Sequence, residues 1–277
     1  MEIYLWIAIG AILIACILSF IFSSRWLKVR NYSVSCKKLS EETGDVRITL
    51  ISDLHEASFG KDNSKLIKKI QETFPDVIVI AGDVADTYGK VGGSYENLFK
   101  RLPEIAPTYL VFGNHDYAAR RDVELAGVAA NTGIMLLDDI CSEFRIGKDV
   151  INIIGVSDYS RENVVSQTLA QRIDIIPISD FIRRCNILIS HRPVELEEIA
   201  IRGLDIMLCG HTHGGQMRLP FFGGVFEPSS IRLFPKYDRG HFGIKKMNLI
   251  ISSGLGASVV PLRFFNRPEV TVIDVHK

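Results

Sequence analysis

The sequence predicts an α/β layered fold that follows one membrane-spanning helix at the amino terminus. Apolar, β-branched runs recur along most of the chain, and such runs are typical of strands buried on both faces. Amphipathic segments with apolar residues at three-and-four spacing lie between several of these runs, and strands that alternate with helices favour an α/β fold. The third observation is a long uncharged run near the first residue, which has the length of a membrane span.

The amino-terminal run extends from Ile3 to Phe22, twenty residues without a charged side chain. At helical rise it spans about 30 Å, the thickness of a bilayer's hydrocarbon core. Glu2 is the only charged side chain before the run. Five cations and no acid follow it directly: Arg25, Lys28, Arg30, Lys37 and Lys38. This asymmetry predicts a single-pass anchor over residues 1–24, with the following domain on the cytoplasmic side.

Two other interpretations of this run fit less well. A cleaved secretory signal has a basic start and a shorter apolar run, whereas this run is long and its start is acidic. The residues up to Cys16 resemble a lipoprotein signal, but the apolar run continues six residues beyond that cysteine. An uncleaved anchor is therefore the prediction.

After a basic juxtamembrane linker over residues 25–45, residues 46–277 are expected to form one domain, since a single core can serve that length. Buried strands are predicted, in order, at Val46–Ile51, Val77–Ala81, Tyr109–Phe112, Val150–Val156, Ile187–Ile189, Ile206–Leu208, Leu249–Ile251 and Val270–Val275. Helices are predicted between them at Asn63–Thr73, Asp122–Asn131 and Val194–Arg202.

Composition narrows the classes of function. The chain has 277 residues, and its 32 basic side chains equal its 32 acidic ones, so no strong net field gathers a polyanion and nucleic-acid binding is not expected. Its five cysteines include no CxxC pair, which disfavours both a disulfide framework and a thiolate zinc site.

Histidines and aspartates gather at the predicted carboxyl ends of strands. Of seven histidines, five stand there: His55, His115, His191, His211 and His213. Open α/β sheets bind ligands beyond the carboxyl ends of their strands, so these loops are expected to converge on one site. Any one of these residues alone is more often a turn or a cap, but together they indicate a metal site. Imidazole, carboxylate and amide donors without a thiolate suit Mn²⁺, Fe or Zn²⁺.

In order along the chain, the residues at these strand ends form the motifs DxH, GD, GNHD, a single H and GHTH. This set of motifs resembles the signature of the calcineurin-like metallophosphoesterase superfamily. The resemblance extends from Val46 to His276. The residues Gly210–Gln216, Pro261–Arg263 and Arg267–Glu269 are similar to the membrane-associated bacterial branch, which includes enzymes that act on UDP-2,3-diacylglucosamine. The resemblance implies a four-layer αββα sandwich of two mixed β-sheets.

The resemblance also implies roles for the matching residues. The first cation would be held by Asp53, His55, Asp83 and His213, and the second by Asp83, Asn114, His191 and His211. Two divalent ions are implied, with Mn²⁺ expected first and Fe or Zn²⁺ as alternatives, and a metal-bridging hydroxide would attack phosphorus. His115 would stabilise the transition state or protonate the leaving oxygen.

Two aspartates near these ligands have two interpretations each. Asp116 either orients the His115 imidazole, which would make it part of the catalytic set, or accepts backbone N–H bonds as a turn residue. Asp86 is expected beside the ligands or as a helix cap. Three arginines either reach phosphate oxygens or are solvated charges of loops and helix starts: Arg120, Arg121 and Arg192.

The substrate is the least specified part of the prediction. Residues 214–246 carry six aromatic side chains, which either form a wall or lid for an apolar phosphorylated substrate or pack on the core. The expected function is phosphodiester or pyrophosphate hydrolysis on a lipid-linked or membrane-proximal substrate, with no obligate protein partner. The alternatives are a cyclic-nucleotide or nucleotide phosphodiesterase, a protein phosphatase, or a metal-bound interaction scaffold without turnover.

Overall fold

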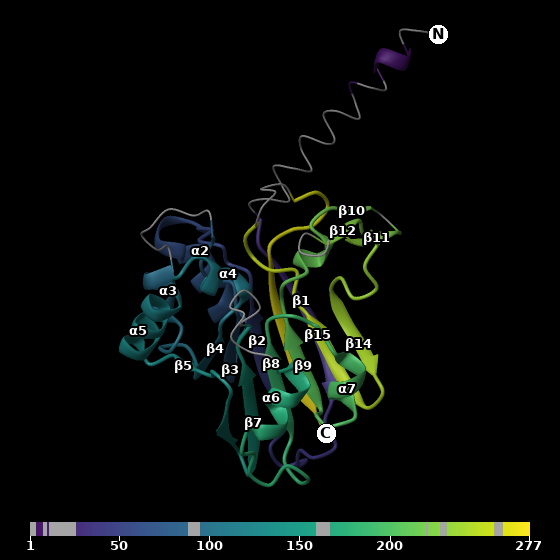
Figure 1. Ribbon diagram of the computed structural model, residues 1–277. Helices are drawn as coiled ribbons and strands as arrows, with labels where there is room; N and C mark the ends of the chain where they lie inside the picture. The colour runs from purple at the N-terminus through teal and green to yellow at the C-terminus, as the bar shows by residue number, and fades with distance from the viewer. Residues whose placement is uncertain are drawn as a thin grey trace.

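Two six-stranded mixed sheets face each other at the centre of the molecule, and helices cover their outer faces (Figure 1). The computed structural model describes residues 4–7, 10, 26–87, 95–158, 167–219, 221–227, 232–257 and 263–277. Its layers confirm the predicted α/β fold with two mixed sheets and the αββα order.

The first sheet has the strand order β1-β16-β2-β3-β4-β5. Neighbours from β2 to β5 are parallel, while β16 is antiparallel to β2 and parallel to β1. The bounds are β1 Lys28–Ser35, β2 Val46–Ile51, β3 Val77–Ala81, β4 Thr108–Val111, β5 Met135–Leu136 and β16 Glu269–His276.

The second sheet has the strand order β14-β15-β9-β8-β7-β6. Its four central strands are parallel, and the two outer strands, β14 and β6, run antiparallel to their neighbours. The bounds are β6 Ile140–Ile146, β7 Asp149–Val156, β8 Asn186–Ser190, β9 Ile206–Cys209, β14 Gly240–Ile244 and β15 Met247–Ile251.

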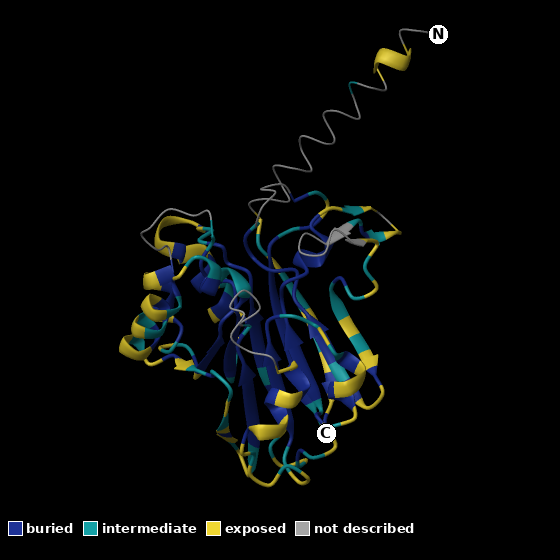
Figure 2. Cartoon of the chain, in the orientation of Figure 1, coloured by how far each residue is buried: buried dark blue, intermediate teal, exposed yellow. Residues whose placement is uncertain are grey.

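Side chains that alternate along each central strand enter two different cores. In β3, Val77, Val79 and Ala81 pack between the two sheets, whereas Ile78 and Ile80 pack under the helices of the first sheet. Successive side chains of a strand point to opposite faces, so a strand buried on both faces needs apolar residues at every position. This explains the uninterrupted apolar runs, and Figure 2 shows the central strands buried throughout.

Helices close the outer faces with their apolar stripes. Over the first sheet lie α2 (Ser64–Gln71), α3 (Tyr95–Arg101) and α5 (Asp122–Thr132), and over the second lie α6 (Leu169–Ile175) and α7 (Leu196–Ala200). The shorter elements are η1 (Lys61–Asn63), α4 (Asn114–Ala118), η2 (His213–Gly215) and the paired strands β10 (Arg218–Leu219) with β11 (Gly223–Gly224) and β12 (Phe226–Glu227) with β13 (Arg232–Leu233).

The segment 25–45, expected to be a linker, contains the edge strand β1 and is part of the domain. Strand β1 pairs with β16 in register from Lys28 opposite Glu269 to Ser35 opposite His276. Only Val34 of this strand is buried, because an edge strand leaves most of its side chains in solvent. A mostly polar strand of this kind has no apolar run for sequence reasoning to detect, and the expectation of a linker was wrong for these residues.

The predicted span Ile3–Phe22 lies almost entirely outside the described residues, which include only 4–7 and 10 of it. Among the described residues, no helix combines the length and the apolar character needed to cross a bilayer.

Candidate metal centre

Loops at the carboxyl ends of β2, β3, β4, β8 and β9 meet at one end of the two sheets, as predicted. Backbone hydrogen bonds tie them to one another. The N–H of Asp53 donates to the carbonyl of Gly82 at 3.0 Å, and the N–H of His55 donates to the carbonyl of Asp83 at 3.1 Å. The N–H of Gly210 donates to the carbonyl of His191 at 3.0 Å, which joins the β8 and β9 loops.

The predicted ligands form two compact clusters of buried side chains. Asp53, His55 and His213 make the first cluster, and Asp83, His191 and His211 the second, with the ligand atoms of each within 4.8 Å of one another. In the first, Nε2 of His55 lies 3.3 Å from Nε2 of His213. In the second, Nε2 of His191 lies 3.1 Å from Nδ1 of His211.

The Asp83 carboxylate lies between the two clusters. Its Oδ2 is 3.0 Å from Nε2 of His191 in one cluster and 3.7 Å from Nε2 of His55 in the other. Its Oδ1 accepts the backbone N–H of His115 at 2.8 Å, which fixes the carboxylate plane. Asp83 is therefore placed to serve two cations at once.

The donor set fits a pair of divalent cations. The Oδ1 of Asn114 is buried and has no hydrogen-bond partner, as expected of a ligand oxygen reserved for a cation. The Nδ1–H of His191 donates to the carbonyl of Ala81 at 2.7 Å, so the Nε2 lone pair faces the cluster. No thiol lies among these ligands, and imidazole with carboxylate and amide oxygen suits Mn²⁺, Fe or Zn²⁺.

The pKa values of two ligand imidazoles favour cation binding, whereas that of a third means that a proton competes with the cation. Burial lowers the pKa of the His55 and His211 imidazoles to about 3, so both are neutral and keep a lone pair. Burial also opposes protonation of His191, but the Asp83 carboxylate outweighs it and raises the His191 pKa to about 10. The raised pKa means that a cation would have to displace a proton from His191.

The ligand-bearing loops are tightly built. Asp53, His55, Asp83, His211 and His213 all have left-handed backbones, with φ between +45° and +71°. Such conformations cost free energy for residues other than glycine, and they cluster at functional sites.

Two glycines allow the β3 and β4 loops to touch. A Cβ on Gly82 would lie 2.6 Å from the backbone nitrogen of Gly113, and a Cβ on Gly113 would lie 2.2 Å from Oδ1 of Asp83. A larger residue at position 82 would displace the backbone of Gly113, and one at position 113 would displace the Asp83 carboxylate.

His115 lies at the edge of the first cluster, where it was predicted to act on the ester. Its ring meets the His55 ring edge-on, with centroids 4.8 Å apart. Its Nδ1 is 2.9 Å from the hydroxyl of Thr87 and 3.6 Å from Oδ1 of Asp86. Asp86 therefore lies beside the ligands, and Thr87 holds the imidazole.

Asp116 serves the loop and does not orient His115. Its carboxylate accepts backbone N–H bonds from Asp83 at 2.9 Å, Ala85 at 2.8 Å and Gly113 at 2.8 Å. These three bonds join the β3 and β4 loops beneath the bridging carboxylate. These are the contacts of the turn-residue interpretation, and none of them supports the catalytic role predicted for Asp116.

Sequence reasoning missed a sixth loop, which follows β15. The N–H of Leu255 donates to the carbonyl of Ser52 at 3.0 Å, and the N–H of Gly256 donates to the carbonyl of Asp53. The signal was present, because β15 is also an apolar run that ends in polar residues and a glycine, Ser252, Ser253 and Gly254.

Arg263 lies against this sixth loop and is only 2% exposed. Its Nε and Nη2 donate to the carbonyls of Gly256 and Ser253, each at 2.9 Å. Its Nη1 is buried without a hydrogen-bond partner, and no carboxylate of the described residues forms an ion pair with it. Burial lowers the pKa of Arg263 to about 10, so the guanidinium is charged at neutral pH.

Of the three arginines predicted to reach phosphate, Arg120 is exposed and the other two are engaged elsewhere. Arg121 forms ion pairs with Glu56 at 3.0 Å and with Glu124 at 2.7 Å. Arg192 donates to Asp158 at 2.7 Å. Their charges are neutralised by these partners, so neither matches the expected phosphate contact.

The aromatic segment 214–246 divides into two parts. Tyr237 and Phe242 pack against the core over the second sheet, with ring centroids 5.2 Å apart. Phe221, Phe222 and Phe234 are exposed. The expectation of core packing therefore holds for the first pair and fails for the other three, while the side chain of Phe226 lies outside the described part.

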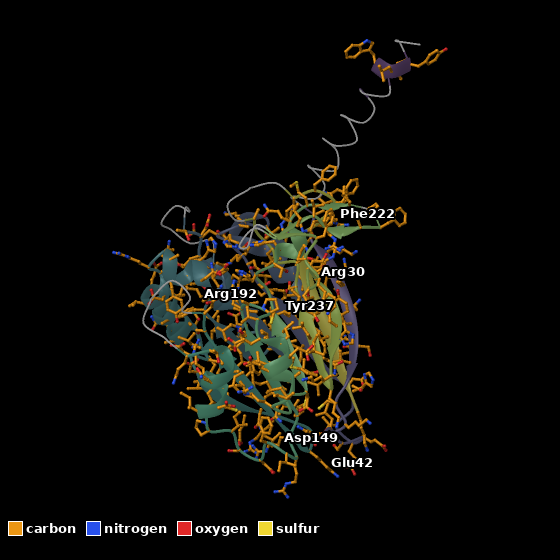
Figure 3. The ribbon with its side chains drawn as sticks, turned by 45° about the vertical axis from the view of Figure 1, so that its right-hand side comes forward. Arg30, Glu42, Asp149, Arg192, Phe222 and Tyr237 are labelled. Atoms are coloured by element: carbon orange, nitrogen blue, oxygen red, sulfur yellow. The ribbon has the colours of Figure 1, made fainter. Side chains whose placement is uncertain are left out.

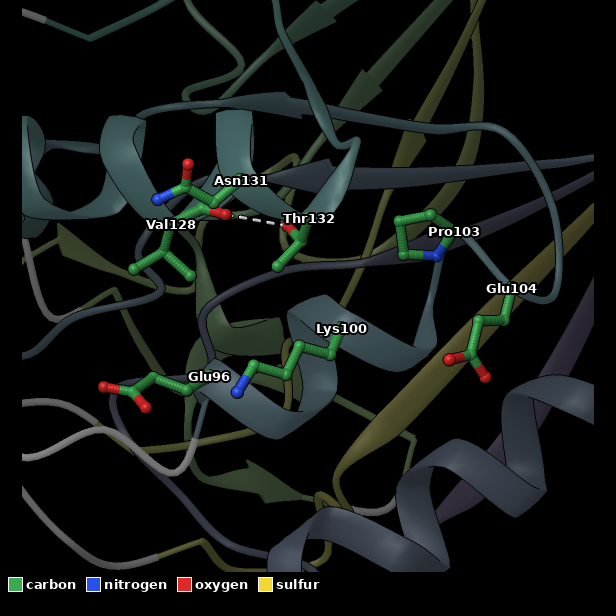
Figure 4. Close-up of a pocket in the computed structure, with 7 residues that line it drawn as sticks. All are labelled: Glu96, Lys100, Pro103, Glu104, Val128, Asn131 and Thr132. Carbon is green, nitrogen blue, oxygen red and sulfur yellow. Dashed lines mark hydrogen bonds between the residues drawn. The ribbon is translucent and has the colours of Figure 1, made fainter.

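A separate hollow of about 750 Å³ lies between α3 and α5 and is distinct from the metal centre (Figure 4). It is lined by Glu96, Lys100, Pro103, Glu104, Val128, Asn131 and Thr132. The Thr132 hydroxyl donates to the carbonyl of Val128 within its wall at 2.8 Å. None of its residues is a predicted ligand.

Known proteins match the chain over most of its length. The family model "Calcineurin-like phosphoesterase" matches residues 46–215. The YpbG protein of Bacillus subtilis (strain 168) is 31% identical over 242 residues, which cover 86% of this chain and 84% of YpbG. The phosphodiesterase YaeI of Escherichia coli (strain K12) is 27% identical over 255 residues, covering 90% of this chain and 88% of YaeI. A metallophosphoesterase of Aquifex aeolicus (strain VF5) is 27% identical over 259 residues, covering 90% of this chain and 92% of that protein.

The family match ends at Gly215, just after the last ligand, and therefore contains every residue of both clusters. A family that hydrolyses phosphoesters at a dinuclear centre agrees with the shared position of Asp83. The chain belongs to the calcineurin-like phosphoesterase family and is a metal-dependent phosphohydrolase.

Proposed function

We propose that this phosphohydrolase cleaves a phosphodiester or pyrophosphate bond in a lipid-linked or membrane-proximal substrate, with Mn²⁺ as its first-choice cation. The observation that carries the hydrolytic part is the Asp83 carboxylate, which lies within 3.7 Å of an imidazole in each of the two ligand clusters. One carboxylate that serves two cations holds them close enough to act on one phosphoryl group.

Bound cations would supply Lewis-acid polarisation of the phosphoryl oxygens and a water of lowered pKa. The protein residues do the remaining work. Asp83 sets the spacing of the two clusters, and Asp116 keeps the Asp83 loop in place through its three backbone bonds. His115, held by Thr87, donates a proton to the leaving oxygen.

Arg263 is assigned an electrostatic role. Arg263 donates to the carbonyl of Gly256, and the N–H of Gly256 donates to the carbonyl of Asp53, so the guanidinium lies beside the first cluster. A fixed cation in a dry site stabilises the negative charge that develops on a phosphoryl group in the transition state.

The class of substrate is supported by two further observations. The name of YaeI, phosphodiesterase, favours a diester over a monoester. The apolar run Ile3–Phe22 and the cations after it favour a membrane anchor over residues 1–24, with the domain on the cytoplasmic side. An anchored site meets substrates at the bilayer surface.

The test compares hydrolysis of bis-p-nitrophenyl phosphate and p-nitrophenyl phosphate by the full chain with Mn²⁺, beside the Asp83→Ala variant. We expect metal-dependent cleavage that favours the diester and is lost in the variant. The next step compares UDP-linked lipids and phospholipids with cyclic nucleotides and phosphopeptides.

Faster turnover of the monoester, or of phosphopeptides, would contradict the proposal in favour of a protein phosphatase. A protein that holds two cations and cleaves none of these esters would contradict it in favour of an interaction scaffold.

A further inference from the structure

Eight large apolar side chains are exposed on β10 to β13 or on segments beside them, and Figure 3 shows one of them, Phe222, at that end of the molecule. Phe221 is fully exposed, and Phe222 is 75% exposed. We call the set the apolar patch: Trp26, Met217, Leu219, Phe221, Phe222, Leu233, Phe234 and Phe265. Soluble proteins rarely gather this much exposed apolar surface unless a partner covers it.

Backbone bonds hold the segments of the patch together. Met217 forms a β-bridge with Phe264, and the N–H of Arg218 donates to the carbonyl of Phe264 at 2.9 Å. The N–H of Phe234 donates to the carbonyl of Val225, which in turn donates its N–H to Met217. These bonds join three of the segments that carry the patch.

Cations surround the patch where it meets Trp26. A hollow of about 430 Å³ there is lined by Trp26, Lys65, Lys69 and Arg267 among others. Within the described part of the chain, neither Lys65 nor Arg267 forms an ion pair, and Arg267 instead donates to the backbone carbonyl of Trp26 at 2.9 Å. These unneutralised charges favour an anionic partner.

The pKa of the neighbouring Lys28 is lowered, in part because other positive charges lie close to it. The charge of Arg30, partial burial and the charges of Arg239 and Arg267 lower it. A second copy of the chain seated on this end would place like cations against one another, which disfavours self-association as the way to cover the patch.

Chain continuity identifies the partner. Trp26 belongs to the patch and follows the apolar run Ile3–Phe22 by only four residues. A run of that length that spans a bilayer places Trp26 at the headgroup level, where indoles are enriched. The rest of the patch then lies at the same level.

We propose that this end of the domain is a bilayer-docking surface, on which the exposed phenylalanines enter the acyl region and the hollow at Trp26 binds the headgroup of an anionic phospholipid. Aromatic side chains suit the first contact, and lysine and arginine side chains suit the second.

Docking has a consequence for the site that rests on the proposed function. Ligand His213 opens η2, and Met217 of the patch follows it by four residues, so the metal centre and the patch lie at the same end of the molecule (Figure 1). A docked domain would therefore meet a lipid-linked phosphate without extracting the lipid from the bilayer.

The test uses the full chain in vesicles of phosphatidylcholine and phosphatidylglycerol. The chain has two tryptophans, so Trp6→Phe and Trp26→Phe together remove its tryptophan fluorescence. Phe222→Trp then introduces a single fluorescent reporter. The matched control is Ile182→Trp, since Ile182 is 85% exposed and precedes the amino-terminal end of β8, opposite the site.

We expect phospholipids with brominated acyl chains to quench the reporter at position 222 and to leave the reporter at position 182 bright. The proposal would be overturned if neither reporter were quenched, that is, if each emitted equally in brominated and in ordinary vesicles. A blue shift at position 222 that grows with protein concentration in detergent and is not quenched by the lipid would also overturn it, because that result shows a second copy on the patch.

The headgroup contact has its own variant and control. Lys65→Glu combined with Arg267→Glu should reduce the quenching in phosphatidylglycerol vesicles to the level seen in phosphatidylcholine alone. Lys148→Glu, next to Asp149 at the far end of the molecule (Figure 3), should leave it unchanged. Equal loss in both variants would contradict a specific headgroup site. None of these readouts requires hydrolysis, so they fail or succeed independently of the proposed activity.

Discussion

The metal centre and the apolar patch lie at the same end of the domain, but they are built in opposite ways. The side chains of both ligand clusters are buried and their loops are cross-bonded, with three backbone N–H groups held by Asp116 alone. The patch, in contrast, leaves Phe221 and Phe222 in solvent. The comparison separates the chemistry, which requires fixed donors, from the proposed contact with a bilayer, which requires an accessible surface.

Among the variants that test this contrast, His115→Ala is expected to reduce turnover the most. Loss of a general acid lowers turnover by about a hundred-fold or more. The imidazole contacts Thr87 and lies at the edge of the first cluster, so the variant should keep both cations. Steady-state kinetics with metal analysis of the same sample measure both effects. A variant that loses its cations would make His115 a ligand.

A smaller effect is expected from Arg263→Met, which removes a buried charge near the first cluster. Turnover should fall by about tenfold to a hundred-fold, as for the loss of one electrostatic group, with two cations retained. Arg263→Lys should recover part of the rate because it keeps the charge. If the two variants are equally slow and equally unstable to heat, Arg263 only supports the sixth loop.

The Thr87 hydroxyl is expected to contribute about tenfold, in the range of residues that orient a functional imidazole. Thr87→Val removes its contact with Nδ1 of His115 and keeps the volume of the side chain. The expected signature is a lower kcat with KM nearly unchanged, and Thr87→Ser should restore the rate. A Thr87→Val enzyme with the rate of the unmodified chain would show that His115 needs no such partner.

The smallest effect is expected from Phe222→Ser on a soluble diester. The side chain is 75% exposed and is not one of the buried ligands, so turnover of bis-p-nitrophenyl phosphate and the midpoint of thermal unfolding should both stay unchanged. A large loss on the soluble ester would show that the patch is part of the catalytic machinery, and the contrast between the two regions would fail.

Sequence reasoning predicted the centre better than its surroundings, for physical reasons. Strands buried on both faces need continuous apolar runs, so their ends, and with them Asp53, Asp83 and His191, are visible in the sequence. Strand β1 is an edge strand with one fully buried side chain, Val34, and carries no such signal. Arg263 was not predicted to act at the site because it contacts a loop, at Ser253 and Gly256, whose place beside Asp53 only the fold reveals.

The most direct test of the central claim is the number of cations bound by the full chain and by Asp83→Asn, measured by elemental analysis after dialysis against Mn²⁺. Asparagine keeps the shape of the side chain and removes the charge that two clusters share. The account predicts two cations per unmodified chain, one or none in the variant, and no diester turnover by the variant. An Asp83→Asn chain that retains two cations and normal turnover would contradict the assignment of Asp83 as the bridging ligand.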